Sequence, residues 1–397
     1  MLAFLAPIPI IRASFFSVIM PWILTFLTFL IVVYFGGHLY ILLHISSFLS
    51  GESWRYGYYV FYAILAIWWI VARVLDNRDF PRWSDILLTI GSFALPWMFY
   101  SSIFLIAYDF CLLFASLFDV SYLLFSPAVR LGLFLGLHGF VFLWLIFGYV
   151  NARSPTIIPY SVVYNPEKKS SLKTVKIALL SDIHIGTLNQ WNVLRNIVDR
   201  VNESWVDIVL LAGDIFDGRL DIVESRALHL PLWDLRAPMW VYGAYGNHEY
   251  YGDPVLAKHL LEEVGVVMLQ DEWRVVDGLY ILWRDDRSVH TMTGKNRREV
   301  VDLMSGNRDK LPTILIDHQP SHLEKAEEAW VALQVSGHTH NGQLWPLGLI
   351  AAFVFEKSLG YHRRWNTHYV VSAWAATWWF PIKTSAKSEI PLITFQY

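Results

Sequence analysis

The stretch VKIALLSDIH, residues 175–184, shows the pattern on which the fold of this chain depends. Its first six residues are mostly apolar, which is typical of a buried strand, and a polar cluster follows the strand at once. Four later segments repeat this arrangement. The predicted strands are Val175–Leu180, Ile208–Leu211, Met239–Tyr242, Thr313–Ile316 and Leu333–Val335.

Five polar clusters follow these strands and contain the side chains that could bind metal ions or act in catalysis. They are Ser181-Asp182-Ile183-His184, Gly213-Asp214-Ile215-Phe216-Asp217, Gly246-Asn247-His248-Glu249, Asp317-His318-Gln319-Pro320 and Ser336-Gly337-His338-Thr339-His340. One such cluster is more often polar capping than a metal site, but five in one domain reverse that interpretation. Carboxylates, an amide and imidazoles form a mixed oxygen and nitrogen set that suits borderline or hard divalent ions. Loops after strand ends are also where α/β sheets gather ligand groups.

Amphipathic helices are predicted between the strands. Val193, Leu194, Ile197, Val198 and Val201 fall on one face at helical period. Ser321 followed by Glu324 has the spacing of a capping box and predicts a capped helix start. The alternation of strands and helices, taken alone, favours a single parallel sheet.

The ordered series of clusters resembles the calcineurin-like metallophosphoesterase superfamily over about residues 174–397. The resemblance implies an α/β metallophosphoesterase domain, a β-sandwich flanked by helices, in place of the single parallel sheet. It implies a hydrolase of phosphoester bonds with two divalent ions, manganese, iron or zinc, and attack at phosphorus by a hydroxide held between them. The preceding hydrophobic half, which ends in Asn151-Ala152-Arg153-Ser154-Pro155, is similar to the multi-span membrane subgroup of these proteins.

The resemblance also assigns a role to each matching residue. One metal would be held by Asp182, His184, Asp214 and His340, and the other by Asp214, Asn247, His318 and His338. His248 would face the substrate and assist the leaving group, as a general acid or by charge stabilisation. Asp217 would orient its imidazole, the alternative being that Asp217 caps the next helix. Asn341 stands where relatives usually have glycine, which puts the shape of the substrate rim in doubt.

Residues 1–153 form a predicted transmembrane helical domain, and residues 154–397 the predicted catalytic domain. No Asp, Glu, Lys or Arg occurs from Ala13 to Gly51, which exceeds the roughly 20 residues that cross a bilayer. We predict about four spans, near 18–42, Tyr58–Ile70, Ile86–Ala107 and Leu131–Val150. A further apolar run, Phe110–Phe125, could add a fifth span and reverse the topology.

Basic residues in the short connections predict the orientation. With four spans, one side receives Arg12, Arg73, Arg78, Arg82, Arg153, Lys168, Lys169 and Lys173, and the other only Arg55 and Arg130. This bias predicts that the catalytic domain faces the cytoplasm, and the resemblance favours a plasma (inner) membrane. The net charge of −3 gives no bulk attraction for a nucleic acid.

Two apolar stretches bear on the substrate. Leu347–Phe355 follows the His340 loop, and Trp374, Trp378, Trp379 and Phe380 cluster near the end of the chain. Beside a site tethered to a lipid bilayer, they predict an acyl-chain groove or a rim that dips into the membrane, the alternative being core packing.

The favoured function is hydrolysis of a phosphodiester or pyrophosphate on a membrane lipid, either a phospholipid or a nucleotide-linked lipid. Two alternatives stay open. The chain could cleave a soluble phosphodiester or phosphoprotein while the bundle serves as an anchor. It could also be a catalytically silent metal-binding scaffold, or a regulator of its membrane bundle.

Overall fold

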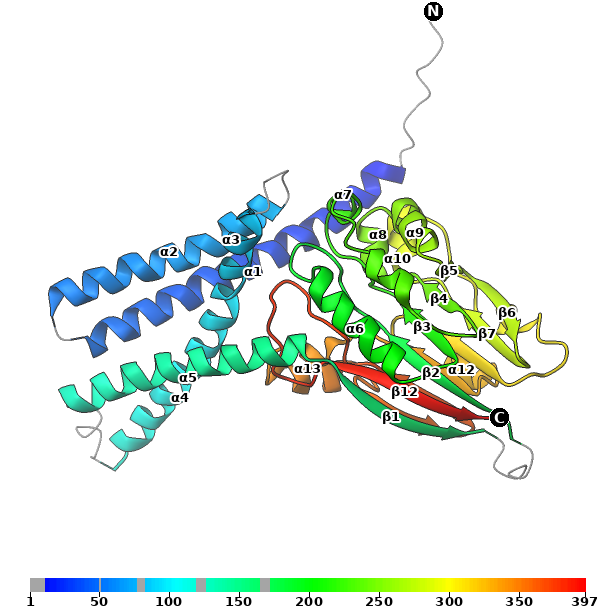
Figure 1. Cartoon of the computed structure of the whole chain (residues 1–397). Helices are drawn as coiled ribbons and strands as arrows, with labels where there is room; N and C mark the ends of the chain where they lie inside the picture. Colours follow the sequence, from blue (N-terminus) through cyan, green and yellow to red (C-terminus); the bar gives the residue numbers. More distant parts are fainter. Residues whose placement is uncertain (1–10, 50, 77–82, 119–125, 165–171) are drawn as a thin grey trace, which may run out of the picture. The chain divides into compact units, whose positions relative to one another are not determined.

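The computed structural model describes residues 11–49, 51–76, 83–118, 126–164 and 172–397 (Figure 1). The chain divides into two compact units. One comprises Met1–Ile70 and Ala94–Leu143, and the other, which we call the catalytic unit, comprises Val71–Phe93 and Trp144–Tyr397. The domain boundary that we predict after residue 153 rests on sequence character and stays a prediction.

The N-terminal part is helical. Its helices are α1 (Ile11–Phe48), α2 (Glu52–Asp76), α3 (Trp83–Ser92), α4 (Ala94–Ser116) and α5 (Pro127–Arg153). Within the described residues, three segments are long and apolar enough to cross a bilayer, namely Ile31–Phe48, Asp85–Ser116 and Pro127–Arg153. The predicted span Tyr58–Ile70 lies in α2 and is not among them, so the prediction of four spans is confirmed only in part. Phe110–Ser116 continues α4, and residues 119–125 lie outside the described residues.

Polar side chains of the first unit form hydrogen bonds between helices. Nε2 of His44 lies 2.9 Å from Oδ1 of Asp109, and the Tyr40 hydroxyl donates to the same carboxylate at 2.6 Å. The Tyr58 hydroxyl lies 3.1 Å from Nε2 of His138. These pairs join α1 to α4 and α2 to α5, which is a structural role for polar groups in an apolar bundle.

Two six-stranded sheets form the core of the catalytic unit. The first has the order β1 (Thr156–Val163), β12 (Glu389–Gln396), β2 (Thr174–Leu180), β3 (Ile208–Ala212), β4 (Val241–Ala244) and β5 (Val267–Met268). The second has the order β10 (Gly360–Arg364), β11 (Thr367–Val371), β9 (Leu333–Ser336), β8 (Thr313–Ile316), β7 (Leu279–Trp283) and β6 (Glu272–Val276). The strands β2 to β5 run parallel, as do β7, β8, β9 and β11.

The two sheets pack face to face, so the single parallel sheet that alternation favours is wrong and the sandwich implied by the resemblance is present. In β2, Ile177 and Leu179 belong to the core shared by both sheets, while Ala178 and Leu180 face the core beneath the helices. Because both faces of such a strand are apolar, its sequence carries no sign that a second sheet covers one of them.

Helices cover the outer faces of the sandwich. They are α6 (Trp191–Glu203), α7 (Leu220–Ser225), α8 (Asn247–Tyr251), α9 (Pro254–Glu263), α10 (Ser288–Thr293), α11 (Val300–Met304), α12 (Glu324–Glu328) and α13 (Leu347–Val354), with short 3₁₀ turns η3 (Leu230–Asp234) and η4 (His340–Gly342). The predicted apolar face of α6 is confirmed, since all five of its residues are buried.

Two local predictions are wrong. The capping box of Ser321 and Glu324 does not form, because Leu323 is the N-cap of α12 and the Ser321 hydroxyl accepts from Arg287 at 2.9 Å. The predicted strand Met239–Tyr242 begins two residues later, at Val241. Trp240 has φ of 76° and its N–H closes a turn onto Ala237, which is incompatible with extended backbone.

The last ten residues of α5 belong to the catalytic unit and pack against residues 381–388. The N–H of Lys383 donates to the carbonyl of Gly148 at 3.0 Å. The Asn151 amide donates to the carbonyls of Lys383 and Ala386, each at 2.8 Å. A Cβ on Gly148 would lie 2.6 Å from a methyl group of Ile382, so only glycine allows this close packing.

Truncation of Trp283 tests the sandwich core. Trp283 is fully buried between the sheets, with its ring 5.0 Å from that of Tyr242. We expect Trp283→Ala to lower the free energy of unfolding by about 3–5 kcal/mol, because it leaves a large cavity. The matched control is Trp205→Ala, where the side chain is 84% exposed. Thermal unfolding in detergent should show a clear loss only for the first variant, and equal midpoints would contradict this core.

Candidate metal centre

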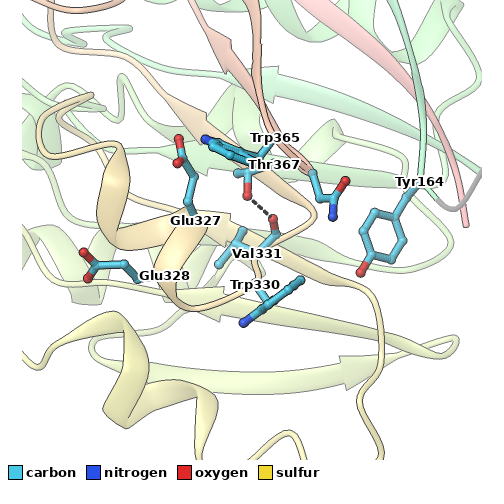
Figure 2. Close-up of a pocket in the computed structure, with 8 residues that line it drawn as sticks. Tyr164, Glu327, Glu328, Trp330, Val331, Trp365 and Thr367 are labelled. Carbon is cyan, nitrogen blue, oxygen red and sulfur yellow. Dashed lines mark hydrogen bonds between the residues drawn. The ribbon is translucent and has the colours of Figure 1, made fainter.

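One cleft at the edge of the sheets in the catalytic unit does not contain the predicted site. It has a volume of about 300 Å³ and opens where β9 and β11 begin (Figure 2). Its walls are formed by Tyr164, Glu327, Glu328, Trp330, Val331, Trp365, Asn366 and Thr367. None of these residues is a predicted metal ligand, so the chemistry lies at the opposite ends of these parallel strands.

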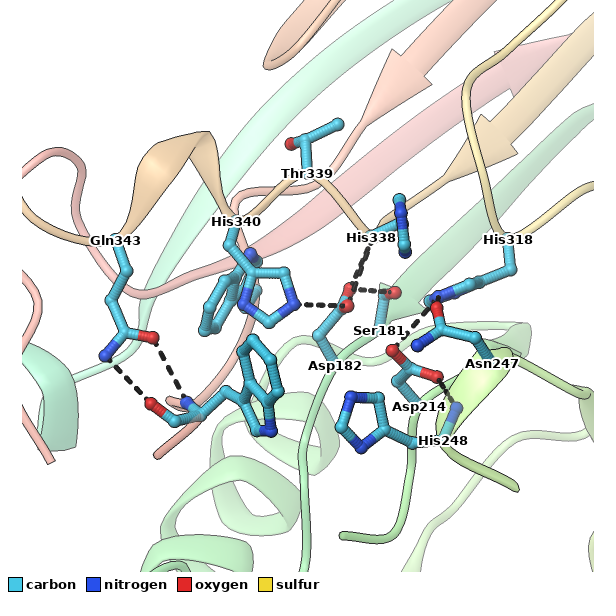
Figure 3. A network of polar contacts seen from close by, with 12 residues as sticks. Ser181, Asp182, Asp214, Asn247, His248, His318, His338, Thr339, His340 and Gln343 are labelled. Carbon is cyan, nitrogen blue, oxygen red and sulfur yellow. Dashed lines mark hydrogen bonds and ion pairs between the residues drawn. The ribbon is translucent and has the colours of Figure 1, made fainter. Parts of the chain in front are cut away.

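The loops that follow β2, β3, β8 and β9, together with the start of α8, bring the predicted ligands together (Figure 3). Within the described residues, three groups of side chains each have ligand atoms within 4.8 Å of one another. These groups are Asp182 with His184, Asp214 and His340; His184 with Asp217 and His248; and Asp214 with His318 and His338. The first and third groups share Asp214, which is the arrangement that a bridging carboxylate requires. Asn247 joins the third group, since its Oδ1 lies 3.2 Å from Nε2 of His318.

Five of the predicted ligands have left-handed backbone. The φ angles are 53° at Asp182, 50° at His184, 53° at Asp214, 68° at His338 and 57° at His340. Each such residue costs on the order of 1–3 kcal/mol and persists only where the surroundings hold it, which is typical of functional sites. Asn341 also has a positive φ, of 44°, a conformation that asparagine tolerates better than most residues and that suits the glycine expected from the resemblance.

Two glycines allow the loops to approach each other closely. A Cβ on Gly337 would overlap the hydroxyl of Ser181, and a Cβ on Gly246 would overlap Oδ1 of Asp214. These positions therefore exclude any side chain. The close approach brings the backbone of the His338 loop onto Asp182, whose Oδ2 accepts from the His338 N–H at 3.0 Å.

Glu249 holds the Asp214 loop in place. Its carboxylate is fully buried and accepts four backbone N–H groups, those of Gly246 at 2.7 Å, Ile215 at 2.8 Å, Asp214 at 2.9 Å and Phe216 at 3.1 Å. No role is predicted for Glu249 from the sequence, although it belongs to one of the five polar clusters. The signal was its place three residues after Gly246, at the start of a helix, where a glutamate closes back on the N-cap.

The imidazoles have the free nitrogens that metal binding requires. Nδ1 of His318 contacts the carbonyl of Ala212 at 2.7 Å, which leaves Nε2 facing Asp214 at 3.1 Å. Within the described chain, neither ring nitrogen of the buried His184 has a hydrogen-bond partner, and the same holds for Nδ1 of His338 and of His340. Buried polar atoms are nearly always paired, so these atoms fit a bound cation. Burial lowers the pKa of His184 to about 4, so its imidazole is neutral and can act as a ligand near pH 7.

His248 lies beside these ligands and is paired with Asp217. Its Nδ1 is 2.9 Å from Oδ1 of Asp217, and its ring centroid is 4.6 Å from that of His184. Burial lowers the pKa of His248, but the hydrogen bond to Asp217 and the charges of Asp214 and Asp217 outweigh it and raise the pKa to about 9. Arg219, and not Asp217, is the N-cap of α7. Asp217 thus makes the contact that the orienting role requires, and the role itself stays a prediction.

The two apolar stretches near the site differ. Trp374 is fully buried and packs edge-on against His340, so core packing is correct for that residue. On α13, by contrast, Leu349 is 70% exposed and Phe353 is 91% exposed. Gln343 joins the two regions, because its amide donates to the carbonyls of Trp378, Phe380 and Ile382 at 3.1, 3.0 and 2.9 Å.

A small cavity borders the site beside His184 and Asp217. This cavity of about 20 Å³ is lined by His184, Asp217, Arg219, Thr377 and Trp379, among others. Arg219 was not singled out by the sequence analysis, because a lone arginine after a strand end carries no specific signal. Its guanidinium is paired with the carboxylate of Asp221, and its place in the lining of this cavity becomes visible only in the folded chain.

Comparison with known proteins gives concordant matches. Residues 175–342 match the family model described as calcineurin-like phosphoesterase. An uncharacterized metallophosphoesterase of Helicobacter pylori is 31% identical over 270 residues, which cover 66% of this chain and 69% of the relative. Proteins described as transmembrane protein with metallophosphoesterase domain are 29% identical in Danio rerio and 28% identical in Bos taurus. The match covers 63% of this chain and 60% of the relative in both cases.

Substitution of Glu249 tests what holds the centre together. We expect Glu249→Gln to lower metal content and stability, because the amide presents an NH₂ group to buried N–H donors. Each donor left without an acceptor costs about 1–3 kcal/mol. The control is Glu263→Gln, which removes a half-exposed partner of His229. Bound metal measured by elemental analysis should fall only in the first variant, and full metal content in Glu249→Gln would refute the role.

Proposed function

Since this chain belongs to the calcineurin-like metallophosphoesterase family, we propose that it is a membrane-bound hydrolase of phosphoester bonds. The observation that carries the proposal is the overlap of two ligand groups on Asp214. One group takes Asp182, His184 and His340, and the other takes His318, His338 and Asn247. Bound there, a pair of divalent ions would activate water and stabilise the charge that develops on the phosphoryl oxygens.

The side chains of this chain supply the remaining steps. His248 delivers a proton to the leaving-group oxygen. Asp217 engages Nδ1 of its ring, so Nε2 is the nitrogen that can donate, and the adjacent carboxylate favours the protonated ring. The main-chain N–H of His248 also donates to Oδ1 of Asp214 at 2.8 Å. This bond fixes the distance between the proton donor and the carboxylate shared by both ligand groups.

The substrate that we propose is a phosphodiester or pyrophosphate on a membrane lipid, a phospholipid or a nucleotide-linked lipid. Two features support it. The chain has apolar helices that are long enough to cross a bilayer, and the exposed apolar helix α13 lies beside the His340 loop. A soluble substrate would give no reason for such a surface next to the site.

We further propose that the catalytic unit faces the cytoplasm of a plasma (inner) membrane. The support is the excess of eight basic residues over two in the short connections, counted with α2 as a span. α2 has 25 residues, which at about 1.5 Å per residue is long enough for the roughly 30 Å of a bilayer core.

The metal chemistry can be tested before the natural substrate is known. Full-length protein in detergent would be stripped of metal, reloaded with manganese and assayed with bis-(p-nitrophenyl) phosphate. We expect His248→Ala to lower turnover about 100-fold or more while bound metal stays constant, because the proton donor is lost. We expect Asp214→Ala to lose both metal and turnover, because both ligand groups lose their shared member.

The control for this test is His259→Ala, which removes an exposed histidine outside the site and should leave turnover unchanged. If fully loaded wild-type protein shows no turnover on this ester or on membrane lipid extracts, a silent metal-binding scaffold becomes the better description. If turnover survives in both site variants, the centre is not where hydrolysis occurs.

A further inference from the structure

An apolar surface on the catalytic unit lies next to the metal centre and has no charged side chain. From Leu344 to Phe355 the sequence contains no Asp, Glu, Lys or Arg. Within this run, α13 exposes Leu349, Ile350, Phe353 and Val354 by 70%, 59%, 91% and 66%. We call these four side chains, together with the exposed Trp345, the apolar rim. So many adjacent exposed apolar residues mark a surface that is covered in the working protein.

We propose that the apolar rim inserts into the membrane interface and seats the metal centre at the level of the lipid headgroups. The insertion stands on the geometry of the rim. Insertion would also present the headgroup of a lipid to the metal centre, and this second step rests on the proposed function.

The rim is tied to the end of a candidate membrane helix. The N–H of Trp345 donates to the Thr384 hydroxyl at 3.0 Å, and the Ser385 hydroxyl donates to the carbonyl of Asn341 at 2.6 Å. The neighbouring Lys383 is hydrogen-bonded to Gly148 of α5. Gly148 lies within the apolar segment Pro127–Arg153, five residues before its end. One short segment therefore joins the rim to the last turns of α5, which belong to the catalytic unit and end a candidate membrane helix.

The rim is also tied to the metal centre. The 3₁₀ turn η4 begins with His340, and α13 begins five residues after that turn ends. At the other end of α13, the ring centroid of Phe355 lies 6.1 Å from that of His338. Insertion of α13 therefore fixes the height of both predicted ligands relative to the lipid surface.

The composition of α13 favours a lipid bilayer, and not a protein partner, as the environment that covers the apolar rim. The helix consists only of Leu, Gly, Ile, Ala, Phe and Val, whereas protein interfaces combine an apolar centre with a polar, hydrogen-bonding rim. Its eight residues span about 12 Å, too short to cross the membrane, so the helix lies in the interface. Trp345, with one polar N–H on a large ring, is the residue type that prefers that depth.

The single cysteine allows a direct measurement of insertion. In a Cys111→Ala background, Phe353→Cys or Leu349→Cys would be labelled with an environment-sensitive fluorophore. The full-length protein would be placed in nanodiscs of phosphatidylethanolamine and phosphatidylglycerol, with and without nitroxide-bearing lipid. The control is Val275→Cys, 53% exposed on β6, a strand that lies far from α13 in the catalytic unit (Figure 1).

We expect blue-shifted emission that nitroxide lipid quenches at positions 353 and 349, and water-like, unquenched emission at position 275. Emission at 353 and 349 that matches the control would overturn the proposal. Emission that is shifted only in discs holding two copies, without lipid quenching, would show that a second copy covers the rim and would overturn it as well.

Activity assays test the insertion of the apolar rim separately from the proposal of a lipid substrate. We expect Phe353→Glu to lower kcat/KM about tenfold or more on a vesicle-borne phosphodiester lipid, because a carboxylate opposes insertion, and to leave hydrolysis of bis-(p-nitrophenyl) phosphate unchanged. Val275→Glu should change neither. If the labels insert but no lipid is hydrolysed, the rim stands and the lipid substrate fails. If Phe353→Glu lowers both activities equally, the rim acts on the fold of the centre and not on the membrane.

Discussion

The metal centre depends on the hydrogen bonds that the buried carboxylate of Glu249 accepts from the backbone. The carboxylate receives N–H groups from two loops, the one after β3 that carries Asp214 and the one after β4 that opens α8. Asn247 and His248 belong to the second loop. One buried acceptor therefore sets the position of the shared carboxylate, an amide ligand and the proton donor together. A buried carboxylate is stable only when its lone pairs are met, so this arrangement forms completely or not at all.

Hydrogen bonds also stabilise the predicted ligands whose backbone is left-handed. A chain that leaves a strand of the sandwich must turn sharply to point its polar side chain at its neighbours, and the left-handed region provides that turn at a single residue. Asp214 has φ of 53°, and its N–H is one of the groups that Glu249 accepts. The strain at Asp214 is thus offset by a charged hydrogen bond. At Asp182 the offset comes from the N–H of His338 and the hydroxyl of Ser181.

The sequence predicted which ligand side chains gather at the centre, but it did not predict the residues that hold their loops in place. The reason is physical. Ligands such as Asp182 and His340 are recognisable because strand ends and residue types are local features. Glu249 accepts one N–H from Gly246, which is a local pattern, but its other donors lie more than thirty positions away, as do the carbonyls to which Gln343 donates. Such distant partners leave no local pattern. The second sheet was invisible for a related reason, since Ile177 and Ala178 are equally apolar although they face different cores. An apolar run likewise cannot reveal whether it is buried like Trp374 or exposed like Phe353.

The segment 381–388 holds the end of α5, a candidate membrane helix, within the catalytic unit. The backbone of Lys383 is bonded to Gly148 and Asn151 of α5, while its fully buried side chain donates to the carbonyls of Ala373 and Trp374. Burial lowers the pKa of Lys383, while the charges of Glu389 and Asp182 act in the opposite direction and favour its ammonium form. Trp374 in turn packs against His340. The last turns of α5 are therefore linked through Lys383 and Trp374 to His340, a predicted metal ligand, by contacts within the catalytic unit.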